Sequence, residues 1–297
     1  MHNFRQKFKN MRNILIGILI IVISTSSCKE KSESINEKLV NESYKTDVDF
    51  KTIESDFMKW WTYHYNTINL SKNFIAINES SEVISKEEFL KTLTSGKHIA
   101  LKIKTKENSV VKYQLFKLDE KADKTISSTI KKVSLTDYKH FQMETKDFPE
   151  FEFTDIEGNT FNNESLKGKT TLIKTWFINC KPCIAEFPEL NKLVEKYKHR
   201  DDIQFISLAL DSKSELETFL TKKDFRYKVV PDQKELITEK LELQAYPTHL
   251  VINQNGTILK VTNKASVMMA FIQVQDILSN KKDSKIPPPP PPPAKSS

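Results

Sequence analysis

Residues Thr171–Leu190 read TLIKTWFINCKPCIAEFPEL, and this segment is the most informative in the chain. Its apolar first part predicts a continuous buried strand over Thr170–Phe177. A short loop follows, and a C-x-x-C motif at residues 180–183 then opens a segment with helical spacing that is interrupted or bent at Pro188. The segment therefore predicts a strand–loop–helix unit with two thiols at the start of the helix.

The sequence on both sides continues an alternation of strands and helices, which indicates a mainly parallel sheet. FEFTDIEGNTFN predicts an entry hairpin, and IQFISLAL (Ile203–Leu210) predicts the next buried strand. Ser214 and Glu217 predict the capped start of another helix. THLVIN and TILKVT predict a hairpin around residues 255–256, followed by a terminal helix over Ser266–Leu278.

The two cysteines of the motif fit redox chemistry better than structural cross-linking. The chain has three cysteines, Cys28, Cys180 and Cys183, and a bridge across two intervening residues closes too small a loop to constrain the unfolded chain much. A thiol at the first turn of a helix has a lowered pKa. Lys181 adds a positive charge there, and Pro182 stands where its missing N–H costs nothing. We therefore predict Cys180 as the exposed nucleophile and Cys183, one turn deeper, as the resolving thiol.

Two further residues are candidates for the same site. Glu186 lies three residues after Cys183 and on the same helix face, where a partly buried carboxylate would accept or relay a proton; a solvent-facing glutamate fits the sequence equally well. Pro247 precedes a predicted strand, and a cis Tyr246–Pro247 bond would expose the Tyr246 backbone to a substrate strand, with an ordinary trans proline as the alternative. We predict no metal, because a zinc site would need a second C-x-x-C or Cys/His pair and the sequence has none.

These segments resemble a known family. WFINCKPCIAEFPEL and YPTHLVINQNGTI, in this order, are similar to segments of the TlpA/ResA-like thiol–disulfide oxidoreductases that are tethered in bacterial envelopes. The resemblance covers about Lys146–Leu278 and implies an α/β, thioredoxin-like domain with a central mixed sheet. It also implies that Cys180 is the nucleophile, Cys183 the resolving thiol, Glu186 the active-site carboxylate and Pro247 the cis-proline.

The resemblance further implies the reaction and its partners. Family members mostly reduce protein disulfides with electrons from a membrane thiol donor, through a redox-active disulfide (here Cys180–Cys183) and without another cofactor. The residues predicted to contact the substrate are Tyr246, Pro247, Trp176, Lys181 and Pro182.

Two positions depart from the family pattern. Asn179 stands where a tryptophan usually precedes the first cysteine, which changes the flat apolar surface that a partner would meet. His249, two residues after Pro247, is also unusual. A strand residue at this position is predicted to face away from the thiols.

The N-terminus predicts export and lipidation. A basic stretch precedes the apolar run Ile14–Ile23, which as a helix would span only about half of the hydrocarbon core of a bilayer. Small residues then lead to Cys28, so residues 1–27 resemble a bacterial lipoprotein signal with Cys28 as the acylated residue. Ordinary signal cleavage with a free Cys28 is the alternative. The expected location is the bacterial cell envelope, facing the periplasm, and Lys29 favours the outer membrane.

The rest of the chain divides by composition. We predict a polar tether over residues 28–48, a small α+β module over 49–145, the thioredoxin-like domain over 146–280 and a proline-rich disordered tail over 281–297. In the module, an aromatic-rich helix over Asp49–Tyr63 is predicted to pack into a core, and no constellation of chemical groups is evident. The formal net charge of +7 is small and dispersed, so nucleic-acid binding is not expected.

Disulfide reduction is the favoured function, with alternatives. Fold and motif do not fix the direction of electron flow, so a disulfide oxidase or isomerase stays open. A binding lipoprotein with a static disulfide is a third hypothesis. A peroxidase with a Pro-x-x-x-Thr-x-x-Cys loop is not favoured, because Ile173 and Phe177 occupy the places of that proline and threonine.

Overall fold

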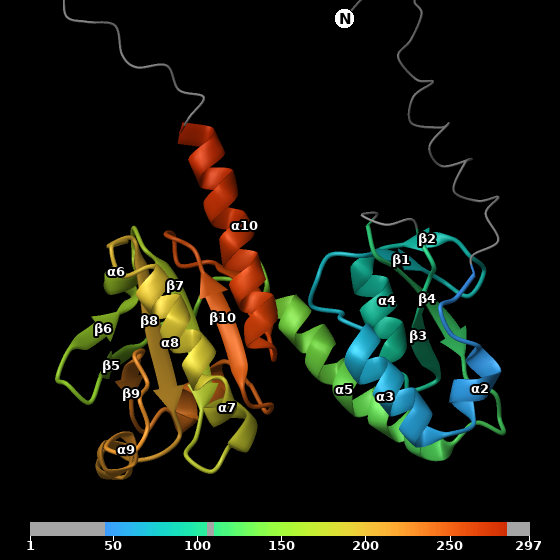
Figure 1. Cartoon of the computed structure of the whole chain (residues 1–297), viewed down its shortest axis with the longest axis horizontal. Helices are drawn as coiled ribbons and strands as arrows, with labels where there is room; N and C mark the ends of the chain where they lie inside the picture. Colours follow the sequence, from blue (N-terminus) through green and yellow to red (C-terminus); the bar gives the residue numbers. More distant parts are fainter. Residues whose placement is uncertain (1–44, 106–109, 284–297) are drawn as a thin grey trace, which may run out of the picture. The chain divides into compact units, whose positions relative to one another are not determined.

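The computed structural model describes residues 45–105 and 110–283. Two sheets, of four and five strands, each have their own hydrophobic core (Figure 1). The predicted signal peptide, Cys28, nearly all of the tether and the polyproline segment lie outside these residues. Among the helices within the described ranges, none combines the length and the apolar character needed to cross a bilayer.

The N-terminal module is an α+β unit. Its sheet has the strand order β2-β1-β4-β3, and its four helices include the long α5. The elements are α2 (Phe50–Glu54), α3 (Phe57–Thr67), β1 (Ile75–Ile77), β2 (Val83–Ile84), α4 (Lys86–Leu93), β3 (His98–Lys102), β4 (Lys112–Lys117) and α5 (Lys124–Met143).

The first helix of this module differs from the prediction. The segment predicted as one helix is split into α2 and α3, because the Asp56 side chain caps a new helix by accepting a hydrogen bond from Lys59 N at 3.0 Å. Trp60 on α3 is completely buried, so the aromatic-rich segment contributes to the core as predicted, while Tyr65 is exposed.

The second sheet has the strand order β11-β10-β7-β8-β9. Strands β7, β8 and β9 are parallel, whereas β10 is antiparallel to β7 and β11 is antiparallel to β10. The prediction of an α/β domain with a central mixed sheet is therefore confirmed. The strands are β7 (Thr170–Trp176), β8 (Ile203–Ala209), β9 (Lys228–Val230), β10 (Thr248–Ile252) and β11 (Ile258–Thr262), and β5 (Glu152–Thr154) with β6 (Thr160–Asn162) forms the entry hairpin.

Helices connect these strands and cover the sheet. They are α6 (Asn163–Leu166), α7 (Lys181–Ala185), α8 (Phe187–Lys196), α9 (Lys213–Leu220), the π-helix η1 (Leu236–Lys240) and α10 (Ala265–Asp283). The predicted bend near Pro188 is present as a break between α7 and α8 at Glu186. The predicted cap of α9 is wrong by two residues, because the capping box is formed by Ser212 and Glu215.

Alternation along β7 decides which side chains face the helices. Leu172 packs with residues of α8 and α10, and Ile173 packs on the opposite face of the sheet with the core of the entry segment. Lys174 and Trp176 therefore share the face of Leu172. A lysine in this position places a charge beneath the helix that carries the cysteines.

Both edges of the five-stranded sheet are covered by backbone hydrogen bonds. At β11, Thr145 N donates to Ile258 O at 2.7 Å, and Ile258 N donates to Lys146 O at 2.8 Å. At β9, Ile156 N donates to Val229 O at 2.9 Å. The entry segment thus occupies one residue on each edge strand, Ile258 of β11 and Val229 of β9, which shortens the open edges.

Candidate active site

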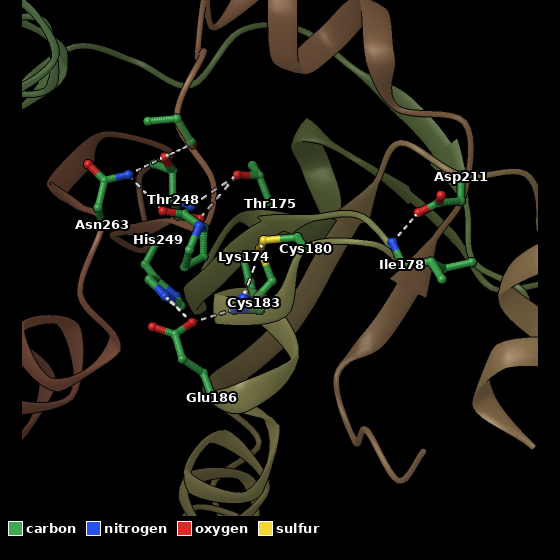
Figure 2. The surroundings of a disulfide bond; sticks show 12 residues. Lys174, Thr175, Ile178, Cys180, Cys183, Glu186, Asp211, Thr248, His249 and Asn263 are labelled. Carbon is green, nitrogen blue, oxygen red and sulfur yellow. Dashed lines mark hydrogen bonds and ion pairs between the residues drawn. A yellow bond between two sulfur atoms is a disulfide. The ribbon is translucent and has the colours of Figure 1, made fainter. Parts of the chain in front are cut away.

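The cysteine pair lies at the junction of β7 and α7. Cys180 and Cys183 form a disulfide bond, and Cys180 is the N-cap residue of α7 (Figure 2). The Cys180 sulfur accepts a hydrogen bond from Cys183 N at 3.3 Å. This contact shows that a free helix N–H is directed at the first sulfur, which would stabilise a thiolate there.

A hydrogen bond to a residue that follows β8 holds the loop that carries Cys180. Ile178 N donates to Asp211 Oδ2 at 2.8 Å, and Asp211 lies two residues after the end of that strand (Figure 2). Partial burial raises the pKa of the Asp211 carboxyl. Asp211 therefore holds the backbone just before the first cysteine.

The expectation of an exposed Cys180 is wrong for the disulfide form. Cys180 is only 5% exposed and Cys183 is fully buried. The cause is a rim of half-buried apolar residues that pack in the same cluster: Ile156, Phe177, Ile178, Ile184 and Tyr246. We call three of these residues, Phe177, Ile178 and Tyr246, the apolar rim.

The prediction that Trp176 contacts the substrate is also wrong. Its side chain is 0% exposed and packs edge-to-face on Phe187 at 5.1 Å and on Phe225 at 5.7 Å between ring centroids. Because the Trp176 side chain points to the helix-covered face of the sheet, it is a core residue. The neighbouring Phe177 takes the surface position instead, with its ring 5.4 Å from that of Tyr246.

The remaining predicted contact residues surround the disulfide. Lys181 and Pro182 are exposed, as is Asn179. The Tyr246–Pro247 peptide bond is cis, as the resemblance implied. Strand β10 begins at Thr248, so its ladder of hydrogen bonds leaves the Tyr246 backbone outside the sheet.

The side chain of Asn263, between β11 and α10, holds the cis-proline loop in place. Asn263 Nδ2 donates to Pro247 O at 2.7 Å and to Thr248 Oγ1 at 2.9 Å (Figure 2). The amide of Asn263 therefore fixes the position of this loop relative to the sheet.

Glu186 receives three hydrogen bonds at the break between α7 and α8. Lys174 Nζ lies 2.5 Å and His249 Nε2 3.0 Å from Glu186 Oε2, and Ala265 N donates to Oε1 at 3.2 Å. Figure 2 shows Lys174 and His249 converging on this carboxylate beside the disulfide. The expectation that His249 faces away is wrong, because its register opposite Lys174 places both side chains on the same face of the sheet.

The charges of this cluster are unequal. Burial lowers the pKa of Lys174 and of His249, both of which have completely buried side chains. Burial also opposes ionisation of Glu186, but hydrogen bonds from His249 and Lys174, together with their positive charge, outweigh it and lower the Glu186 pKa to about 2. Because the pKa of His249 is lowered from 6.5, its imidazole is mainly neutral at neutral pH, whereas the ion pair with Glu186 opposes the effect of burial on the Lys174 pKa and favours the charged form.

A pH dependence of stability follows from Glu186. Its pKa in the folded protein lies below the ordinary value of 4.5, so its contribution is present above pH 4.5 and is lost as the pH falls towards 2. We expect the free energy of unfolding of the wild-type protein to exceed that of Glu186→Gln by roughly 2 kcal/mol near neutrality, and this difference to close in acid. Urea unfolding across this pH range measures it; a constant difference would contradict the assignment.

Lys174 and Asp211 are the site residues that the sequence analysis missed. Lys174 carries a detectable signal, since it interrupts an apolar run predicted to be buried. Asp211 follows a buried strand, but nothing in the sequence indicates its hydrogen bond to Ile178. Within residues 45–105 and 110–283, no cluster of three or more His, Cys, Asp or Glu side chains is arranged to hold a metal ion.

Known proteins match the second half of the chain. Residues 145–261 match the AhpC/TSA family. The thiol-disulfide oxidoreductase ResA of Bacillus cereus (strain ZK / E33L) is 30% identical over 116 residues, which are 39% of this chain and 66% of that protein. The thioredoxin-like protein YneN of Bacillus subtilis (strain 168) is 27% identical over 112 residues, 37% of this chain and 65% of that protein. The match thus spans just under two thirds of each relative.

Among solved structures, a thiol-disulfide oxidoreductase from Bacteroides fragilis NCTC 9343 is 20% identical, with 44% of this chain and 99% of that chain covered and a TM-score of 0.40. The family match over residues 145–261 includes both cysteines, Glu186 and the cis-proline. Over this span the chain is similar to the AhpC/TSA family and to the thiol-disulfide oxidoreductase ResA.

Proposed function

We propose that the protein reduces disulfide bonds of other proteins by thiol–disulfide exchange through Cys180 and Cys183. The observation that carries the proposal is the closed Cys180–Cys183 pair at a helix start, with its first sulfur accepting a backbone N–H and with Tyr246 of the cis Tyr246–Pro247 bond packed in the same cluster. The names of the relatives, thiol-disulfide oxidoreductase and thioredoxin-like protein, support the same chemistry.

The reaction has two exchange steps. In the reduced protein, the Cys180 thiolate attacks one sulfur of the substrate disulfide, which forms a mixed disulfide and releases the other substrate sulfur as a thiolate. Cys183 then loses its proton and attacks the Cys180 sulfur, which releases the second substrate thiol and closes the Cys180–Cys183 bond. Two electrons pass to the substrate, so a dithiol donor must reduce the pair again; we assign this role to a membrane thiol donor.

The surface around the disulfide fits an extended peptide as substrate. The apolar rim provides contact area, and the Tyr246 backbone lies outside the β10 ladder, where a peptide strand can pair with it. Lys181 and Asn179 are exposed next to the first cysteine and give the rim a polar side. We therefore expect substrates to present a cysteine within an unfolded or extended segment.

The cellular setting belongs to the same proposal. The leader and Cys28 support a lipid-anchored protein in the bacterial cell envelope that faces the periplasm, with the outer membrane favoured by Lys29. Metabolic labelling with a radioactive fatty acid should label the wild-type protein and leave Cys28→Ser unlabelled. Labelling of both would contradict acylation at Cys28.

Trapping with Cys183→Ala tests the exchange reaction. Without the resolving thiol, the Cys180 mixed disulfide should persist, and non-reducing gels followed by mass spectrometry should find adducts that disappear on reduction. The matched control is the double variant Cys180→Ser/Cys183→Ala, which should form no adducts. If Cys183→Ala yields no more adducts than this control in reducing cells, the exchange reaction is refuted.

The reduction potential separates reductase from oxidase. A structural or reducing pair has a low potential, whereas a potential close to that of the strong oxidant DsbA, about −120 mV, would favour the oxidase or isomerase alternative. Equilibration of Cys180–Cys183 with glutathione buffers measures this value. A static disulfide that resists reduction by these buffers would support the alternative of a binding lipoprotein.

A further inference from the structure

A row of polar side chains crosses the sheet beneath the cysteine pair. Register places Thr262 of β11 opposite His249 of β10, His249 opposite Lys174 of β7, and Lys174 opposite Ser207 of β8. All four residues are buried, with at most 1% exposure. Since a buried polar group without a partner destabilises the fold, such a row in a hydrophobic core calls for a functional explanation.

Glu186 is the acceptor for the two central members of this row. Its Oε2 is engaged by Lys174 and His249, and its Oε1 by the backbone N–H of Ala265. Its side chain is 20% exposed, whereas the Lys174 side chain is completely buried. A buried ammonium group requires a permanent negative partner, because the desolvation of an unpaired charge is far too costly.

We propose that Lys174 and His249 are positioning residues that keep Glu186 ionised at neutral pH, so that this carboxylate acts on the cysteine pair as a fixed negative charge and not as a titrating proton acceptor. This inference rests on the proposed exchange function for its role in the reaction. It differs from the proton-relay role that the sequence suggested for Glu186, since an oxygen that already accepts two hydrogen bonds from cationic or neutral donors has little basicity left.

The remaining groups that face Glu186 agree with a fixed charge. Tyr227, which directly precedes β9, lies close enough for the Glu186 charge to act on it, and burial together with this charge raises the Tyr227 pKa, so the phenol stays neutral. His249 Nδ1 is buried and has no hydrogen-bond partner among the described residues. With Nε2–H donating to the carboxylate, a neutral imidazole leaves this nitrogen as a lone pair, and Glu186 carries the one negative charge that balances Lys174.

Direct titration of the Glu186 carboxyl tests the inference. Carboxyl-¹³C NMR of the oxidised protein follows the titration, with the resonance assigned by its loss in Glu186→Gln. The wild-type carboxyl should have a titration midpoint well below the ordinary value of 4.5. In Lys174→Met, the proton affinity of Glu186 should rise by about 100-fold or more, which moves its midpoint upward by about 2 pH units or more towards that of an ordinary glutamate. A wild-type midpoint at or above 4.5, or a folded Lys174→Met with an unshifted midpoint, would overturn the inference.

Two variants separate charge from structure. Lys174→Gln keeps an N–H donor without the charge and should shift the midpoint in the same direction as Lys174→Met. Lys260→Met removes another buried lysine, which lies on β11 and whose Nζ pairs with Glu144 Oε1 at 2.8 Å. This substitution should leave the Glu186 midpoint unchanged. An equal shift in Lys260→Met would assign the effect to general loss of packing and reject the positioning role.

The link to redox chemistry has its own readout. The reduction potential of Lys174→Met, plotted against pH, should gain a bend at the raised midpoint of Glu186 that the wild-type protein lacks there and that disappears again in Lys174→Met/Glu186→Gln. Absence of the bend in Lys174→Met would show that the ionisation of Glu186 does not reach the cysteines. Because the titration is made on the oxidised protein and needs no substrate, its failure is distinguishable from failure of the trapping experiment.

Discussion

Cys180→Ser is expected to lower the rate of disulfide reduction by roughly 1000-fold or more, because removal of a nucleophile leaves no path for the exchange reaction. Cys183 cannot replace it, since its side chain is completely buried in the disulfide form. Reduction of a model protein disulfide by the chemically reduced enzyme measures the rate. The substitution preserves the size of the side chain, so the fold should be retained.

The third cysteine provides the matched control. Cys28→Ser removes a thiol far from the C-x-x-C motif in the sequence and should exchange disulfides at the wild-type rate in solution. If Cys180→Ser retained more than about a tenth of the wild-type rate, the nucleophile would have to be sought elsewhere.

Glu186→Ala should give the largest loss of stability among substitutions in the site. It leaves the ammonium group of Lys174 buried without its partner, and breaking a buried ion pair from one side typically costs about 3–5 kcal/mol. The free energy of unfolding from urea titration at neutral pH measures the loss. Loss of the acceptor for His249 and for Ala265 N adds to it.

The double variant distinguishes a buried unpaired charge from lost packing. In Lys174→Met/Glu186→Ala the unpaired charge is removed, so the double variant should be more stable than Glu186→Ala alone. Simple additivity of the two single substitutions would show that Lys174 does not depend on Glu186.

The sequence was sufficient for the fold of the second half of the chain and for the cysteine pair, because both depend on local patterns. A continuous apolar strand, a C-x-x-C motif at a helix start and a proline before a strand are each readable without knowledge of distant contacts. Trp176 was misassigned because a one-residue step along β7 reverses the face of the sheet, and the apolar run alone does not tell which face is covered.

The Lys174–Glu186–His249 cluster could not be predicted from the sequence, for a different reason. Its members lie on β7, at the α7–α8 break and on β10, and only the strand register brings them together. Single polar residues in apolar strands were visible in the sequence, but which of them share a partner is a property of pairing between strands distant in the chain. The same holds for the hydrogen bond between Asp211 and Ile178.

The backbone hydrogen bonds at the edges of the five-stranded sheet limit where another chain can add to it as a strand. An unfolded chain cannot form backbone hydrogen bonds at Ile258 or at Val229 O, since the entry segment already bonds both. Indiscriminate strand addition, the first step of many aggregates, is thereby discouraged at these borders. The backbone of Tyr246 lies outside the β10 ladder, and its side chain packs in one cluster with the two cysteines, so under the proposed function a substrate strand that pairs there would lie close to the reactive sulfurs.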